Sequence, residues 1–207
     1  MTILLLVVGA LAGYLVGSIS FAAIVGRFVV PAADLSKTRV ALPEGPEIEM
    51  DGISATSVSM SAGRRWGCLV SILDIAKAAL VTLAFRYAFP DEPADLAAAG
   101  FAVVGHIWPL WHRFHGGFGI SPMLGGVGAV DPLALVVTLP LGMLVGFVRK
   151  DQMLMVDGWT LFLIPWFILR GSLAEVAYAV AIVALYWSRT WRIRRELHQR
   201  EAAVPSP

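Results

Sequence analysis

Residues 3–26 read ILLLVVGALAGYLVGSISFAAIVG, and this run of 24 residues without a charge decides the class of fold. A helix needs about 20 apolar residues to cross the hydrocarbon core of a bilayer. The run is longer than the apolar region of a usual signal peptide, and Met1-Thr2 supplies no basic segment before it. The sequence therefore predicts an uncleaved membrane-spanning helix, with Arg27 at its cytoplasmic end.

The rest of the chain has the same apolar character. Of its 207 residues, 57% are hydrophobic and 15% are charged, whereas an average soluble domain carries about 25% charged residues. The formal net charge of +1 is too small to drive nucleic-acid binding, and the single cysteine, Cys68, excludes a disulfide scaffold. The composition predicts one all-α domain, residues 1–207, built as a polytopic membrane bundle of helices.

Further apolar runs follow the first one. They are Trp66–Phe89, Ala94–Trp111, Pro132–Val148, Met153–Leu169 and Leu173–Trp187. Between them, the Gly-rich stretch 117–130 is too short to cross the hydrocarbon layer alone. Short helices are tolerated at membrane depth when they are packed within protein. We count this stretch as a half-buried span, which makes seven transmembrane helices.

The basic residues indicate an orientation for these seven spans. One set of connections holds 13 of the 16 Lys and Arg residues, whereas the opposite set holds only Arg170. The other two, Lys77 and Arg86, lie inside the second span. Positive charge collects on the cytoplasmic side of a membrane. The N-terminus is therefore expected outside, with the long loop 28–65 and the basic tail 188–207 in the cytoplasm.

Several polar or small residues inside the spans need a physical reason. Asp74 and Lys77 share one helix face, and ionised groups at this depth must be paired or face a polar cavity. Their pattern fits either an internal ion pair that locks the packing or the lining of a substrate cavity. Ser18 either bonds its own backbone or serves a site. Gly13 and Gly17 form a small-xxx-small face that favours close helix contact.

Three histidines, His106, His112 and His115, lie near the end of the third span. A helical metal site would combine His-x-x-x-His with a carboxylate, and the sequence has no such set, so no metal site is predicted.

The segment His115-Gly116-Gly117-Phe118-Gly119 directly precedes an expected helix. Glycines allow close backbone approach, and the N–H groups at a helix start attract anions. The segment also lies on the predicted basic face. It is interpreted either as an anion-binding loop or as a tight turn between spans.

Five linked stretches carry a family signature. They are Gly13-Tyr14-Leu15-Val16-Gly17-Ser18-Ile19, Asp51–Gly67 with Ala55 and Thr56, Leu73-Asp74-Ile75-Ala76-Lys77, Gly105-His106-Ile107-Trp108-Pro109 and Phe114-His115-Gly116-Gly117-Phe118-Gly119. In this order and spacing they resemble the bacterial integral-membrane glycerol-3-phosphate acyltransferases that use acyl-phosphate as donor. The resemblance covers about residues 13–128, and the remainder matches by hydropathy only.

This resemblance implies seven spans in the bacterial inner membrane and a site open to the cytoplasm. It implies transfer of a fatty acyl group from acyl-phosphate to glycerol 3-phosphate, giving lysophosphatidic acid for phospholipid biosynthesis. Neither metal nor organic cofactor is implied, and the partners are these two substrates and membrane lipid, not nucleic acid. No catalytic residue is assigned. The candidate substrate-contacting residues are Ser18, Arg27, Thr56, Ser57, Arg113, His115, Gly116, Gly117, Gly119, Arg189 and Arg192.

The chain departs from the family pattern where the chemistry is expected. Phe118 stands for the lysine of Gly-Gly-Lys-Gly, and His115 stands for the preceding arginine. Other departures are Gly52 and Ser57 for asparagines, Ser54 for a glycine, Pro122 for a threonine, and Ser188–Arg194 without the family's His and Asn. A phenyl ring cannot replace the charge-assisted bond that an ammonium makes to phosphate.

These departures leave three hypotheses open. In the first, the protein is a working acyltransferase in which Arg113, Arg189, Arg192 or Arg194 takes over phosphate binding. In the second, it is a non-catalytic or re-purposed paralogue that keeps the scaffold and binds lipid. The third, an unrelated channel or transporter, is disfavoured by the odd span count and the absence of an internal repeat.

Overall fold

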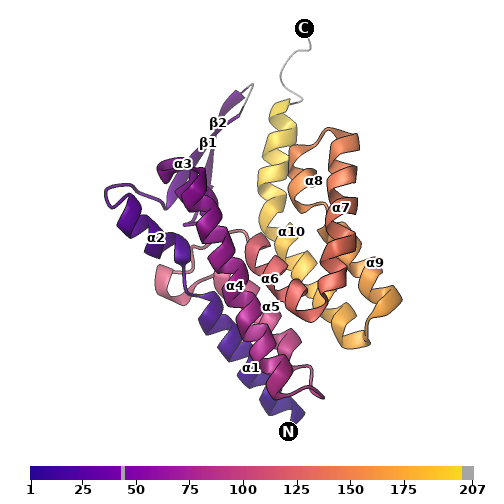
Figure 1. Ribbon diagram of the computed structural model, residues 1–207. Helices are drawn as coiled ribbons and strands as arrows, with labels where there is room; N and C mark the ends of the chain where they lie inside the picture. Colours follow the sequence, from indigo (N-terminus) through magenta and orange to yellow (C-terminus); the bar gives the residue numbers. More distant parts are fainter. Residues whose placement is uncertain (43–44, 202–207) are drawn as a thin grey trace.

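The computed structural model describes residues 1–42 and 45–201, except for the side chains of 37–42, 45–51, 192, 193 and 196–201. Its first apolar run is not one helix, as the sequence predicted. Helix α1 (Thr2–Gly17) ends early, and a separate helix α2 (Phe21–Val29) begins after it (Figure 1). The break has a local cause, because Ser20 caps α2 by accepting a hydrogen bond from the backbone N–H of Ala23 at 3.2 Å.

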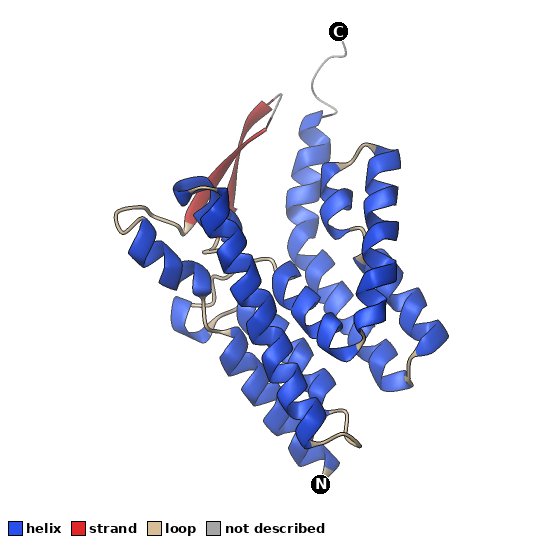
Figure 2. Ribbon diagram, viewed as in Figure 1, coloured by secondary structure: helices blue, strands red, loops and turns tan. Residues whose placement is uncertain are grey.

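The predicted helical bundle is confirmed, and the predicted loop 28–65 adds regular structure that was not expected. Strands β1 (Lys37–Leu42) and β2 (Gly45–Asp51) pair antiparallel, with Lys37 opposite Asp51. Figure 2 shows this hairpin extending from one end of an otherwise helical molecule. Helix α3 (Ala55–Ala62) follows, and it begins with a capping box between Ser54 and Ser57.

The remaining helices run back and forth through the bundle. They are α4 (Arg64–Ala88), α5 (Ala94–Ile107), the short 3-10 helix η1 (Leu110–His112), α6 (Ile120–Val130), α7 (Pro132–Arg149), α8 (Gln152–Asp157), α9 (Thr160–Arg170) and α10 (Leu173–Glu201). The apolar run Met153–Leu169 is thus divided at a turn between α8 and α9. Helix α6, the Gly-rich stretch, is mostly buried and packs against α4, α5 and α7.

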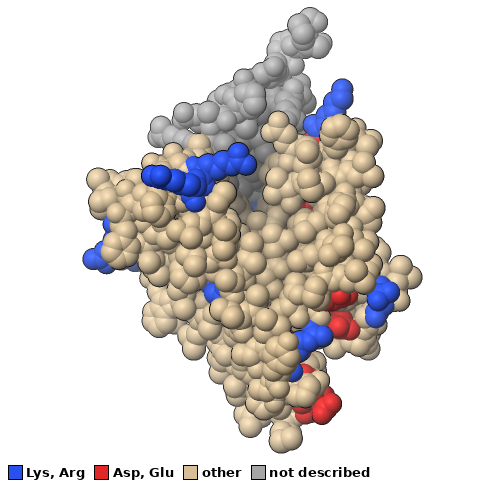
Figure 3. Space-filling view, in the orientation of Figure 1, with Lys and Arg blue, Asp and Glu red and all other residues tan. Residues whose placement is uncertain are grey.

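Four stretches among the described residues are long and apolar enough to cross a membrane. They are Thr2–Val29, Arg64–Ala88, Pro132–Arg149 and Gln152–Arg170, with α6 as a shorter apolar helix. The surface agrees with this, because the middle of the face in Figure 3 is largely free of charged groups. The chain is therefore a membrane protein, and its seven spans and their orientation stay predictions.

Helices α1, α5 and α6, whose ends contact one another, are each too short to cross the hydrocarbon core alone. With a rise of about 1.5 Å per residue, α1, α5 and α6 measure roughly 24, 21 and 16 Å, against about 37 Å for α4. The end of α1, the end of α5 and the start of α6 meet inside the bundle. Gly105 of α5 lies against the backbone of Tyr14 and Ser18, and Gly119 before α6 lies against Ile107 of α5. These interruptions of the helical backbone form the candidate site.

Helices α1 and α5 pack through glycines, which confirms the predicted small-xxx-small face. A Cβ atom on Gly13 or Gly17 would overlap the carbonyl oxygen of Ala98 or Ala102 on α5, and Gly9 lies against the start of α5 in the same way. Without side chains between them the two backbones approach closely, which strengthens dispersion contacts in a lipid environment.

Replacing Gly13 with alanine is expected to destabilise the fold by about 1–3 kcal/mol, because the added methyl group must displace the α5 backbone. The matched control is Gly100→Ala on α5, where a Cβ would meet Tyr178 at an ordinary 3.8 Å. That control should be neutral or stabilising by up to about 1 kcal/mol. Heat-induced loss of folded protein in detergent, followed by size-exclusion chromatography, measures both. Equal midpoints would show that the α1–α5 contact is looser than described.

Candidate functional site

A buried ion pair on α4 lies beside the interrupted ends of α1 and α5. The ammonium of Lys77 is 2.7 Å from the Asp74 carboxylate, and the two side chains are 4% and 2% exposed. Of the two interpretations left open by the sequence, the internal ion pair is confirmed. Lys77 also donates to the carbonyl of Ile19 at 2.6 Å. It therefore satisfies a backbone acceptor that the break between α1 and α2 exposes.

The imidazole of His106, in the last turn of α5, completes this cluster. Its Nδ1 lies 3.5 Å from the Asp74 carboxylate and 3.4 Å from the Lys77 ammonium. Its Nε2 faces Gly117, where an added Cβ would overlap it. Sequence reasoning noted His106 but left it out of the candidate site. The two motifs Leu-Asp-x-x-Lys and Gly-His-x-x-Pro, read as partners, could have found it. No metal-binding group of His, Cys, Asp and Glu occurs among the described residues.

The glycine loop bonds back onto α5, and this changes which of its N–H groups are free. The backbone N–H of Gly116 donates to the Ile107 carbonyl at 3.1 Å, and that of Gly117 donates to the His106 carbonyl at 3.2 Å. These two N–H groups therefore cannot serve an anion as the sequence analysis expected. In the described part of the chain, the N–H groups of residues 118–121 have no acceptor. They form the start of α6, which Gly119 enters with a positive φ of 95°.

The hairpin segment reaches the glycine loop through one close backbone contact. Gly52, directly after β2, is buried and has a positive φ of 112°. A Cβ atom there would overlap the carbonyl oxygen of Gly116. The base of the hairpin thus lies against the loop, which places residues of the long connection beside the candidate site.

Four predicted residues of the first half of the chain lie in different environments. Ser18 is buried, and its hydroxyl donates to the Tyr14 carbonyl at 2.8 Å. Ser57 is also buried, and its hydroxyl donates to the Ser54 carbonyl at 2.7 Å within the capping box. Both hydroxyls are thus engaged by nearby backbone. Thr56 on α3 and Arg27 in the last turn of α2 are exposed.

The predicted cations also differ in their surroundings. Arg113 and His115 are exposed, and the Arg113 carbonyl lies 2.6 Å from Nδ1 of His115. The guanidinium of Arg189 on α10 lies over the Trp108 ring, 6.0 Å from its centroid. Among the described residues, its buried Nε has no acceptor. Among the predicted cations whose side chains are described, Arg189 therefore lies at the end of α5.

Two other arginines of the tail, Arg194 and Arg192, are not shown beside the end of α5. Arg194, an open alternative in the sequence analysis, is buried and bonds the Asp157 carboxylate, which also accepts from Tyr186 at 2.7 Å. This internal pairing engages Arg194 away from a phosphate. The side chain of Arg192 lies outside the described residues.

Phe118, which replaces the family lysine, is half-buried and packs against the core cluster that contains Ile107 and Met123. The substitution has turned this position from a cation into part of the apolar core.

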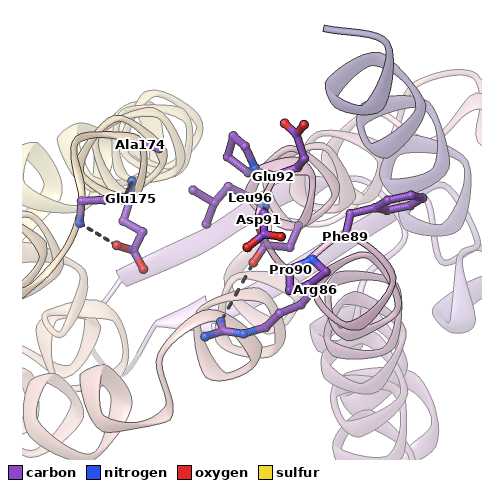
Figure 4. A pocket seen from close by; sticks show the side chains of 11 residues that line it. Arg86, Phe89, Pro90, Asp91, Glu92, Leu96, Ala174 and Glu175 are labelled. Carbon is purple, nitrogen blue, oxygen red and sulfur yellow. Dashed lines mark hydrogen bonds and ion pairs between the residues drawn. The ribbon is translucent and has the colours of Figure 1, made fainter. Parts of the chain in front are cut away.

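Two hollows occur away from this cluster, and the predicted site residues line neither. One, of about 390 Å³, lies at the α4–α5 connection, where Figure 4 shows Asp91, Glu92 and Glu175 around it together with Arg86. The other, of about 560 Å³, is a largely apolar groove between α4 and the α6–α7 pair.

The bundle of apolar helices and its buried polar cluster define an integral membrane protein with a polar site at depth. A family model described as glycerol-3-phosphate acyltransferase matches residues 7–199. Proteins of that name from Anaeromyxobacter are similar: the strain Fw109-5 protein is 33% identical over 180 residues (84% of this chain, 83% of that protein). The strain K protein is 32% identical over 204 residues (93% and 94%).

Solved structures agree with the sequence comparison. The chain resembles the crystal structure of PlsY, an integral membrane glycerol 3-phosphate acyltransferase, in its glycerol 3-phosphate form. The TM-score is 0.75 at 26% identity, covering 94% of this chain and 93% of that one. The chain belongs to the glycerol-3-phosphate acyltransferase family, as its sequence motifs predicted.

Restoring a family-like asparagine at Gly52 is expected to destabilise this chain by about 1–3 kcal/mol, since its Cβ would overlap the Gly116 carbonyl. Gly63→Asn is the control, because Gly63 also has a positive φ, 97°, but no atom within 4 Å of an added Cβ. Thermal unfolding of both variants in detergent measures the difference. If Gly63→Asn loses as much stability as Gly52→Asn, backbone strain explains the loss and the loop contact does not.

Proposed function

We propose that the protein transfers a fatty acyl group from acyl-phosphate to the 1-hydroxyl of glycerol 3-phosphate, forming lysophosphatidic acid. One observation carries the proposal. The four N–H groups of residues 118–121, which have no acceptor among the described residues, lie at a helix start, following a loop that is bonded to the end of α5. Such a start is a ready-made site for the phosphate groups that both substrates carry.

The chemistry needs stabilised negative charge more than it needs a cofactor. A C–O bond forms between the glycerol hydroxyl and the acyl carbon, and the acyl carbon–oxygen bond to phosphate breaks. Inorganic phosphate leaves and takes up the proton that the hydroxyl loses. Preorganised N–H groups and cations stabilise the charge that develops on the carbonyl and the phosphate. Residues 118–121 supply the N–H groups, and Arg189 over Trp108 supplies a cation beside the end of α5.

The proposal includes a topology of seven passes within one domain, residues 1–207, in a bacterial inner membrane. The N-terminus would lie outside and the site would open to the cytoplasm. The alternating direction of α1, α4, α5, α6, α7, α8–α9 and α10 supports this arrangement (Figure 1). The hairpin, α3 and the C-terminal end of α10 then share the side where most basic residues lie, which is typical of a cytoplasmic face.

The protein in membranes, given acyl-phosphate and labelled glycerol 3-phosphate, is expected to form lysophosphatidate above an empty-membrane control. Arg189→Met should raise the KM for glycerol 3-phosphate roughly 10- to 100-fold, because it removes one charge-assisted hydrogen bond to the phosphate. Arg195→Met, an exposed position on the same helix, should leave the KM unchanged. Absence of product from the wild type would reject catalysis and support the non-catalytic, lipid-binding alternative.

Restoring the two family cations, Phe118→Lys with His115→Arg, is expected to lower the KM for glycerol 3-phosphate about tenfold. The lysine would stand at the free N–H groups of the α6 start, where Phe118 now packs on the core. His115→Arg alone, at an exposed position, serves as the control for added charge. A double variant that folds but binds the substrate no better than this control would show that the anion does not rest at this loop.

A further inference from the structure

We propose that His106 is a further anion-contacting residue, held by Lys77 as a neutral ring with its proton on Nε2. In this arrangement the Nε2–H faces the start of α6 and donates a hydrogen bond to the anion bound there. The identity of that anion as a substrate phosphate rests on the proposed function, whereas the protonation state of the ring does not.

The contacts of the Lys77 ammonium favour one state of the His106 ring. An ammonium has three N–H donors and no acceptor. The ammonium is ion-paired with the Asp74 carboxylate at 2.7 Å, and it donates to the Ile19 carbonyl at 2.6 Å. The neighbour at 3.4 Å is Nδ1 of His106, which can only accept from an ammonium. A ring that accepts at Nδ1 carries its proton on Nε2.

The other two states of the ring are disfavoured by charge. A proton on Nδ1 would lie 3.4 Å nitrogen-to-nitrogen from the Lys77 ammonium, and the Asp74 oxygen that could accept it, 3.5 Å away, is already paired with that ammonium at 2.7 Å. An imidazolium would place a second positive charge 3.4 Å from Lys77, with the single carboxylate of Asp74 to balance both. These groups are buried, and unbalanced buried charge is strongly unfavourable.

The Nε2 atom is aimed at the glycine loop. An added Cβ on Gly117 would overlap it, so only glycine at this position lets the ring edge lie directly against the loop. Within the described part of the chain, Nε2 has no hydrogen-bond partner. The free N–H groups of residues 118–121 follow directly after Gly117. His106 thus adds a donor beside this helix start, close to the position where Phe118 has removed the family's lysine.

Nitrogen NMR of the histidine-labelled protein in detergent tests the ring state without any turnover. The chain has four histidines, and the signal lost in His106→Asn identifies the one required. The neutral ring with Nε2–H is expected in the wild type, and Lys77→Met should mix the two neutral forms. An imidazolium or an Nδ1–H ring in the wild type would overturn the inference, whether or not the lysine variant folds.

Enzyme kinetics then test the contact with the anion. Glutamine places its amide nitrogen near the position of Nε2, whereas asparagine reaches only that of Nδ1. His106→Asn should raise the KM for glycerol 3-phosphate roughly 10- to 100-fold, with His106→Gln within about threefold of the wild type. Two folded variants with equal KM values, whether raised or unchanged, would overturn the contact. An inactive wild type with the expected ring signal would reject the proposed function and leave the ring state standing.

Discussion

The ammonium of Lys77 is the interaction on which the rest of the site depends. A charge at this depth in an apolar bundle is stable only when its donors are satisfied. Lys77 meets Asp74 on its own helix, the carbonyl of Ile19 where α1 stops, and the ring of His106 at the end of α5. One side chain of α4 therefore joins two helix ends that are far apart in sequence.

The short helices make this junction necessary. A helix that stops inside a bilayer leaves carbonyl or N–H groups without partners, and no water from the hydrocarbon can satisfy them. The end of α1 is satisfied by Lys77, and the end of α5 is satisfied by the N–H groups of Gly116 and Gly117. The start of α6 is the exception, because its N–H groups remain without acceptors among the described residues. A ligand with phosphate oxygens would complete the hydrogen bonding that the protein leaves open.

Much of the fold follows from rules that act locally along the chain. Long apolar runs predicted the membrane bundle, and glycines spaced by four predicted the contact between α1 and α5. The break at residues 18–20 was not predicted, because the residues on both sides are equally apolar and the break depends on a cap at Ser20 and on distant Lys77. The hairpin was missed although Glu47-Ile48-Glu49-Met50-Asp51 alternates polar and apolar residues, because its partner strand, Lys37–Leu42, shows no such alternation.

At the candidate site, residue type alone does not predict which polar groups are free to bind a ligand. Glycines before a helix correctly indicated a close backbone approach. The sequence could not show that the N–H groups of Gly116 and Gly117 donate hydrogen bonds to carbonyls of α5. Likewise Arg189 and Arg194 look alike in the basic tail, yet among the described residues the guanidinium of Arg194 is ion-paired with Asp157, whereas that of Arg189 lies over Trp108 without a carboxylate partner. A cation already balanced by a buried carboxylate attracts a phosphate weakly, whereas a cation with an unpaired donor gains a hydrogen bond by binding one. Tertiary pairing, rather than the number of arginines, therefore decides which of them can replace the missing lysine.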